Sequence, residues 1–252
     1  MTLEVEQRNG AKTVGSAFIA LREGLAITAW HLVRDAKTVT ARFSDGTERA
    51  VTGVLDWDEA KDVAIVNVET VPRPLARLCL THPPVGARAY AIGAPQGYGF
   101  SFTDGLVSQV QIVDGFTQYQ TSCPISPGSS GGPLLNAEGE VLGVICWSRE
   151  GAQNVNFATP ASCLEALDRQ APPTPWSHLS RIRRAREKSA AAPQRSNRRE
   201  AAATAGNQVC ELRTALQRAV GREIKVTVQD GQQERSFTVR LPADFFPEPP
   251  VR

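Results

Sequence analysis

Short apolar runs, many of them β-branched, alternate with Gly, Pro and Asp-Gly turns over the first 160 residues of this 252-residue chain. No helical period separates the runs, so the pattern favours closed antiparallel barrels over a sheet with crossover helices. A Pro-rich stretch, residues 72–86, divides the runs, and we predict an all-β fold of two six-stranded antiparallel barrels. The predicted strands are Leu3–Gln7, Val14–Ala20, Leu25–Trp30, Val39–Phe43, Val51–Leu55 and Val63–Val68, then Arg88–Ile92, Gly105–Val113, Thr117–Ser122, Pro133–Leu135, Val141–Trp147 and Val155–Thr159.

Net charge divides the chain into three regions. Residues 1–170 hold 13 Lys/Arg against 18 Asp/Glu, residues 171–205 hold 8 against 2, and residues 206–252 hold 7 against 6. The middle region is rich in Ala, Arg, Pro and Ser, and it buries too little apolar surface to offset its ordering entropy. We therefore expect a barrel domain at 1–170, closed by a helix at Pro160–Gln170, then a basic linker at 171–205 and a small helix-hairpin segment at 206–252.

The basic linker has two interpretations. Its part from Ser177 to Ser189 is a candidate basic helix, which suits a nucleic-acid or acidic-surface contact. A solvated, mobile tether is the favoured interpretation, because charge runs are usually just solvated.

The densest cluster of glycine and serine is SPGSSGGPLL, residues 126–135. Gly128 lets the backbone turn its N–H groups inward just before Ser130. Gly131 and Gly132 are expected to leave space in front of a reactive hydroxyl. The segment therefore indicates a loop that carries a serine nucleophile.

A serine hydroxyl is a weak nucleophile that needs a base, and the base needs an acceptor to orient it. His31 ends the apolar run GLAITAWHLV, and Asp62 opens the run DVAIVNV. The order His31, Asp62, Ser130 is one of the known orders of a serine-hydrolase triad. Asp56 and Asp58 lie in the preceding turn, where solvation and turn formation are their expected roles.

These segments together resemble the trypsin-like serine peptidases, most of all the bacterial HtrA/Deg branch. The resemblance covers residues 1–165 and rests on GSAFIA…GLAITAWHLV, DVAIVNV, SPGSSGGPLLNAEGEVLGVI and VGARAYAIGAPQGYGFSFTDGLVSQV. It implies a double barrel and a serine endopeptidase that acts on proteins or peptides through an acyl-enzyme, without metal or organic cofactor. It also implies that Ser130 attacks, that His31 shuttles the proton, that Asp62 orients His31, and that the N–H groups of Gly128 and Ser130 form an oxyanion hole.

The resemblance also implies a substrate pocket. The floor of that pocket lies six residues before the nucleophile, at Pro124. Because proline carries no acid, a preference for Arg or Lys is not expected. Small or medium apolar residues are expected instead. For Trp147 and Phe157, a role in core packing is as well supported as a role in the pocket. The predicted pocket residues are Pro124, Ile145, Cys146, Trp147 and Phe157.

Two departures from the family matter. Trp30 stands before His31 where small residues are usual, so it is expected to alter barrel packing or to cover the histidine. Ser129 replaces an acid that serves zymogen activation in digestive relatives, so that kind of activation is not expected. The alternative function is a catalytically idle or latent module that binds partners.

The last region resembles the end of a PDZ domain, a module that commonly follows HtrA protease domains. Leu212, Leu216 and Val220 share one helical face, and two alternating runs flank Asp230-Gly231. The front of a PDZ domain has no match, so a degenerate remnant and an unrelated capping hairpin stay equally open.

Composition excludes several classes of protein. Five cysteines form no CxxC pair, and the three histidines are too few for a His-rich metal site. Of these, His82 and His178 join no motif and are expected at the surface. No apolar run approaches the length of a membrane span, and no leader precedes the first strand, so a cytoplasmic location is expected. The oligomeric state is not predicted.

Overall fold

The computed structural model describes residues 1–69, 72–94, 100–113, 115–148, 155–191, 223–230 and 233–240. The chain divides into two compact units, Met1–Arg184 and Ala185–Arg252. Among the described helices, none is both long and apolar enough to span a membrane.

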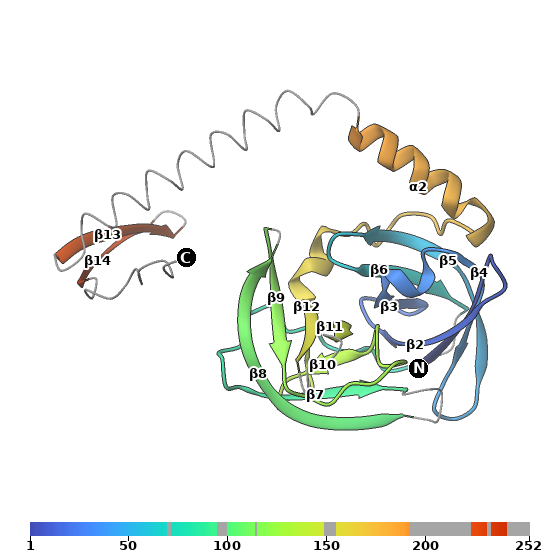
Figure 1. Ribbon diagram of the computed structural model, residues 1–252, viewed down its shortest axis with the longest axis horizontal. Coiled ribbons are helices and arrows are strands. Elements are labelled where there is room, and N and C mark those ends of the chain that lie inside the picture. Colours follow the sequence, from blue (N-terminus) through green and yellow to red (C-terminus); the bar gives the residue numbers. More distant parts are fainter. Residues whose placement is uncertain are drawn as a thin grey trace, which may run out of the picture. The chain divides into compact units, whose positions relative to one another are not determined.

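The first barrel closes six antiparallel strands in the order β1-β2-β3-β6-β5-β4 (Figure 1). Its interior is apolar because every second residue of a strand faces inward, as with the fully buried Leu3 and Val5. A turn at Asp45-Gly46 joins β4 to β5, and Gly46 takes the positive φ of +82° that this turn requires. The strands are β1 (Thr2–Gln7), β2 (Lys12–Ile19), β3 (Leu25–Ala29), β4 (Ala36–Arg42), β5 (Glu48–Asp58) and β6 (Val63–Val68).

The second barrel repeats this plan in the order β10-β11-β12-β9-β8-β7. Leu134, Ile145 and Tyr119 are among the fully buried side chains at its centre. The predicted double barrel is therefore confirmed. The strands are β7 (Arg88–Gly93), β8 (Ser101–Val113), β9 (Phe116–Thr121), β10 (Pro133–Leu135), β11 (Val141–Ser148) and β12 (Asn156–Pro160).

All the predicted strands are present, and the differences lie at their ends. β8 begins at Ser101, four residues before the predicted start, because its first half alternates between half-buried and exposed residues and lacks a continuous apolar signal. β3 ends at Ala29, one residue early, and the chain turns into a one-turn helix, α1 (Trp30–Val33). The predicted helix at Pro160–Gln170 is a shorter 3-10 helix, Ala161–Ala166.

The two barrels share one apolar cluster. It joins Leu25 and Ile65 of the first barrel to Val141 and Val144 of the second, and Leu164 of the 3-10 helix seals it. Because these side chains are almost completely buried, the barrels are packed together as one body.

The start of the predicted linker belongs to the first unit and is not a free tether. Thr174 pairs with Val54 of β5 through hydrogen bonds of 2.7 and 3.0 Å, and Gly53 makes room for it, since a Cβ there would lie 2.2 Å from the Thr174 carbonyl. The helix α2 (Trp176–Ala191) follows, and Trp176 and Leu179 are buried in the core of the first barrel. The average composition of the segment did not indicate this contact, because its two buried apolar residues, Trp176 and Leu179, lie among many charged ones.

The second unit contains a two-stranded antiparallel hairpin, β13 (Glu223–Asp230) and β14 (Gln233–Arg240). Val226 lies opposite Phe237 across the hairpin, and Asp230 pairs with Gln233. The predicted helix through Leu212 and the turn residue Gly231 lie outside the described residues. The likeness to a PDZ domain therefore stays a prediction.

Candidate active site

The paired strands β3 and β6 bring the predicted histidine and aspartate together. Ala29 at the end of β3 lies opposite Val63 at the start of β6, so the next residues outward are neighbours. Helix α1 then carries His31. The backbone closes this corner, because the Trp30 N–H donates to the carbonyl of Asp62 at 3.2 Å.

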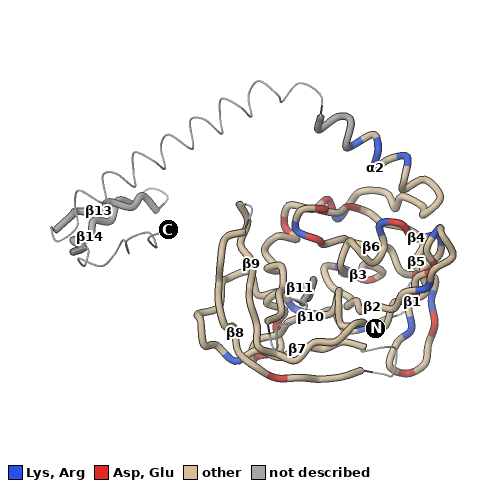
Figure 2. Tube along the Cα trace, in the orientation of Figure 1, with Lys and Arg blue, Asp and Glu red and all other residues tan. Residues whose placement is uncertain are grey.

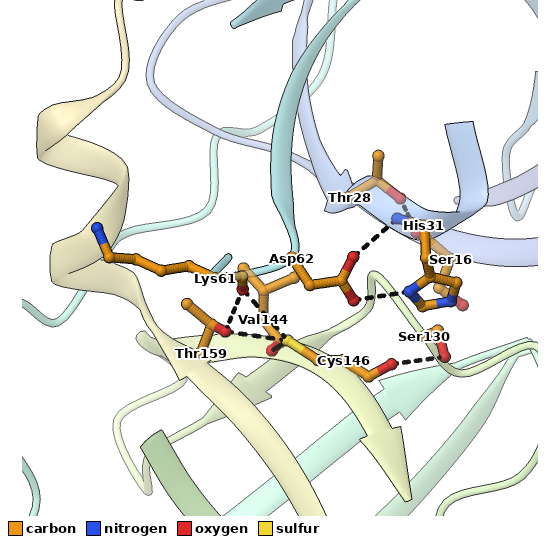
Figure 3. Close-up of polar contacts among 9 residues, drawn as sticks. All are labelled: Ser16, Thr28, His31, Lys61, Asp62, Ser130, Val144, Cys146 and Thr159. Atoms are coloured by element: carbon orange, nitrogen blue, oxygen red, sulfur yellow. Dashed lines mark hydrogen bonds and ion pairs between the residues drawn. The ribbon is translucent and has the colours of Figure 1, made fainter. Parts of the chain in front are cut away.

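Asp62 holds His31 at two atoms (Figure 3). One carboxylate oxygen accepts a hydrogen bond from His31 Nδ1 at 2.6 Å, and the other accepts one from the His31 backbone N–H at 2.7 Å. The φ of Asp62 is +55°, a left-handed conformation that aspartate tolerates better than most residues. Since a carboxylate only accepts, Nδ1 donates and Nε2 is left as the basic atom of the neutral ring.

The two other acidic candidates are engaged elsewhere. Asp56 accepts a hydrogen bond from the Asp168 N–H at 2.8 Å, and Asp58 forms an ion pair with Lys61 at 2.8 Å. This leaves Asp62 as the acid in contact with the histidine.

The serine loop, residues 126–132, presents two unused donors. Gly128 has a φ of +101°, which only glycine adopts readily, and Ser130 follows two residues later. Among the described residues, neither the Gly128 nor the Ser130 N–H has a hydrogen-bond acceptor. The Ser130 hydroxyl is half-buried and donates to the Cys146 carbonyl at 3.1 Å. Its neighbour Ser129 is buried, whereas Ser130 directly precedes the Gly131-Gly132 pair.

Gly131 and Gly132 serve a different purpose from the one expected of them. A Cβ on Gly131 would lie 2.2 Å from the Ser16 carbonyl, and one on Gly132 would lie 2.2 Å from the Ile92 carbonyl. Their missing side chains therefore let the serine loop pack against the backbone of both barrels. They do not clear space for substrate.

Sequence reasoning missed Ser16, a buried residue of β2 that fastens the serine loop to the first barrel. Its hydroxyl donates to the Gly128 carbonyl at 2.7 Å and accepts from the Ala94 N–H at 3.0 Å. Its backbone N–H donates to the Ser130 carbonyl at 2.8 Å. A polar residue inside an apolar strand was the available signal, but the sequence does not reveal a partner more than 100 residues away.

A second network, also missed, joins the aspartate turn to the second barrel. The Thr159 hydroxyl donates to the Lys61 carbonyl at 2.6 Å and lies 3.1 Å from the Cys146 thiol (Figure 3). Burial, with a smaller contribution from the Asp62 charge, raises the pKa of Cys146 to about 12. The thiol therefore stays neutral at physiological pH.

Four of the five predicted pocket residues lie on the paired strands β11 and β12, and Pro124 lies in the segment before β10. Ile145 and Cys146 are buried in β11, and Phe157 is buried in β12. Pro124 lines a small hollow of about 70 Å³ with Ser126 and neighbours on β7 and β8. The Trp147 side chain lies outside the described part, so the pocket stays a prediction.

Trp30 does not cover the histidine. Its ring is buried in the first barrel and stacks on Trp57, with 4.7 Å between ring centres and 7° between planes. Trp30 is therefore part of the packing of the first barrel.

The remaining titratable groups suggest no further centre. His82 is exposed and contacts the hydroxyl of the buried Tyr119 at 2.7 Å, while His178 is exposed on α2. Within the described ranges, no group of three or more His, Cys, Asp or Glu side chains is placed to hold a metal ion.

Comparison with known proteins shows the family of this chain. The model of the trypsin-like peptidase domain matches residues 15–144, which include His31, Asp62 and Ser130. This chain belongs to the trypsin-like peptidase family. The predicted trypsin-like serine peptidase class is therefore confirmed.

Curated relatives place this peptidase in the HtrA branch. It is 38% identical over 157 residues to the Synechocystis protein named as serine protease HhoB, covering 58% of this chain and 37% of that protein. It is 34% identical over 163 residues to the "Probable periplasmic serine endoprotease DegP-like" of Pseudomonas putida, covering 62% and 34%. The chain thus spans little more than a third of the length of these relatives.

Two solved structures that resemble this chain are also proteases. The serine endoprotease from Yersinia pestis superposes with a TM-score of 0.59 at 26% identity, covering 65% of this chain and 60% of that one. The HtrA-type protease AlgW with a tripeptide gives 0.58 at 26% identity, covering 64% and 56%.

The expected cytoplasmic location of this peptidase is wrong. The DegP-like relatives from Pseudomonas putida and Ectopseudomonas mendocina are both named as periplasmic. The expectation rested on the first residues of the sequence, which report a compartment only when they are the first of the whole protein.

Proposed function

We propose that this peptidase is a serine endopeptidase that cleaves proteins through Ser130, His31 and Asp62. Ser130 attacks the scissile carbonyl while His31 Nε2 takes its proton, and His31 then protonates the leaving amine. The ester formed on Ser130 is hydrolysed by water with His31 again acting as base. The observation that carries the proposal is the two-point contact of Asp62 with His31, at 2.6 and 2.7 Å, which fixes the ring and its tautomer.

The oxyanion hole proposed for this reaction consists of the Gly128 and Ser130 N–H groups. Their lack of acceptors among the described residues supports this role, because a preorganised donor must be free when the oxyanion forms. Removing one such donor typically costs about 100- to 1,000-fold in turnover. We also propose that small or medium apolar residues are preferred before the scissile bond, because Pro124 and Phe157 supply no charge.

One observation favours a latent form of the same site. Ser130 donates its hydrogen bond to the Cys146 carbonyl, and no Ser130–His31 hydrogen bond exists between these described residues. Catalytic contacts often tighten only when substrate binds, so the Ser130–His31 contact is expected to form at that stage. Latency therefore predicts slow rather than absent reaction.

The test is labelling with a fluorophosphonate probe, with Ser130→Ala and His31→Ala as matched controls. Labelling of the wild-type protein alone is the result expected for an assembled triad and oxyanion hole. A folded wild-type protein that takes no label over hours contradicts the proposal and favours the idle binding module. Labelling that appears only when an unfolded protein substrate is added identifies the latent form.

A further inference from the structure

A hollow of about 400 Å³ lies on the first barrel directly beside His31. The end of β1 and the residues after α1 form its walls, and the second barrel contributes none of its described lining. It is therefore separate from the predicted pocket around Pro124, which belongs to the second barrel. The lining residues are Gln7, Arg8, Asn9, His31, Arg34 and Asp35.

Hydrogen bonds give this hollow a fixed shape. Gln7 Nε2 donates to the Leu32 carbonyl at 3.1 Å, which ties the end of β1 to the helix that carries His31. The Asn9 carboxamide oxygen accepts from the Ala11 N–H at 3.0 Å and holds the β1–β2 turn. Arg8 donates to the Ser180 hydroxyl at 2.8 Å and to the Trp176 carbonyl, so α2 supports the wall from behind.

The hollow carries excess positive charge. Asp35 is shared between Arg34 at 3.4 Å and Arg183 of α2 at 3.2 Å, so one carboxylate faces two guanidinium groups. The recorded partners of Arg8 are a hydroxyl and a carbonyl, which leave its charge uncompensated within the described residues. Figure 2 shows how basic residues continue along α2. The next carboxylate on β1, Glu6, is already paired with Lys37 at 2.7 Å.

The chemistry of the triad decides which part of a substrate reaches this hollow. His31 must protonate the leaving amine, so the residue after the scissile bond lies against the imidazole. The residue before the bond points toward the second barrel, where Ser130 and the predicted pocket lie. The chain that follows the scissile bond therefore passes over the first barrel beside His31.

We propose that this hollow binds the first or second residue after the scissile bond and favours an acidic side chain there, with Arg34 as the specificity-determining residue. The inference rests on the peptidase activity proposed above. Arg34 is half-exposed, so its contribution is that of a partly solvated charge pair and falls as salt screens it. A preference of about fivefold is the expected scale.

The experiment begins with a denatured casein digest, in which mass spectrometry maps the cleaved bonds. Internally quenched peptides built on one mapped site then carry Glu, Gln or Lys at the first or second position after the bond. For the wild type, kcat/KM for Glu is expected to exceed that for Lys about fivefold at one of the two positions. In Arg34→Glu the order reverses, and in Arg34→Gln the difference shrinks.

Arg22→Glu is the matched control, because Arg22 is exposed at the opposite end of β3 from His31. It makes the same charge change and is expected to keep the wild-type preference. The fluorophosphonate has no residue after its phosphorus, so its labelling reports the triad alone. A wild type that labels yet cleaves Glu and Lys peptides equally overturns the inference and leaves the peptidase proposal intact. An Arg34→Glu variant that labels and keeps the wild-type order overturns it as well.

Discussion

The Thr159 hydroxyl in the second barrel donates a hydrogen bond of 2.6 Å to the Lys61 carbonyl in the first barrel, one residue before Asp62. Thr159→Val leaves that half-buried carbonyl with only the Cys146 thiol, 4.0 Å away, as a donor, at a cost of about 1–1.5 kcal/mol. If the loss falls on the position of Asp62, kcat drops about five- to tenfold while KM changes little. Thr159→Ser restores kcat because it keeps the hydroxyl, and steady-state kinetics on one quenched peptide compares the three proteins. Equal kcat values for Thr159→Val and wild type contradict this role.

Asp62→Asn tests the orientation of the imidazole. An asparagine that donates its amide to Nδ1 forces the proton onto Nε2, the wrong tautomer for a base. The expected result is a fall in kcat of about 10⁴-fold with unchanged circular dichroism. Asp56→Asn is the control, because Asp56 accepts from Asp168 N–H away from the histidine. A fall of less than about tenfold in Asp62→Asn means that His31 is oriented by something else.

Gly131→Ala tests the packing of the serine loop against the first barrel. Its Cβ would lie 2.2 Å from the Ser16 carbonyl at a φ of +82°, so both clash and strain apply. The free energy of unfolding is expected to fall by about 2–5 kcal/mol. Gly139→Ala has a φ of +76° but nothing within 4 Å of the new Cβ, so urea titration should show only the strain, about 1–2 kcal/mol. Equal losses in the two variants rule out a tight interface at Gly131.

Trp176→Ala tests whether α2 is part of the folded barrel. The indole is buried and its Nε1 donates to the Val51 carbonyl at 2.6 Å. The loss expected from deleting it is about 3–5 kcal/mol in the free energy of unfolding. His178→Ala, an exposed residue two positions along, should change stability by less than about 0.5 kcal/mol. If Trp176→Ala leaves the free energy of unfolding unchanged, α2 is not part of the folded barrel and the segment is a tether.

The Cys146 thiol makes stability depend on pH in the alkaline range. Its pKa is about 12 when folded against 9.0 as the ordinary value, so between these values the unfolded state loses a proton that the folded state keeps. The free energy of unfolding therefore falls above pH 9.0, by up to about 1.4 kcal/mol per pH unit from this group. Urea titrations from pH 8 to 10 should show a shallower fall in Cys146→Ala than in wild type, and identical slopes contradict the assignment.

The sequence predicted the barrels well because strand periodicity is a local signal. A nearly continuous apolar run located β6 to the residue, whereas the polar first half of β8 carried too weak a signal to fix its start. Local signals also led to the His31–Asp62 contact, since His31 ends one apolar run and Asp62 opens another, while the role of Ser130 stays a prediction.

What the sequence could not supply are contacts between residues far apart along the chain. Ser16 reaches Gly128 over 112 positions, and Thr159 reaches Lys61 over 98. The sequence around Ser16 or Thr159 contains no motif that indicates the partner residue. Trp176 escaped notice for a related reason, because average composition describes a segment poorly when one large side chain determines where it packs.

The dependence of the aspartate turn on Thr159 has a consequence for synthesis on the ribosome. His31 and Asp62 belong to the first barrel, but the proposed nucleophile Ser130 and Thr159, which contacts the aspartate turn, come from the second. A nascent chain that ends before β12 therefore has a histidine–aspartate pair without a finished site. The proposed hydrolytic activity is therefore expected only after both halves have been translated and have closed on each other.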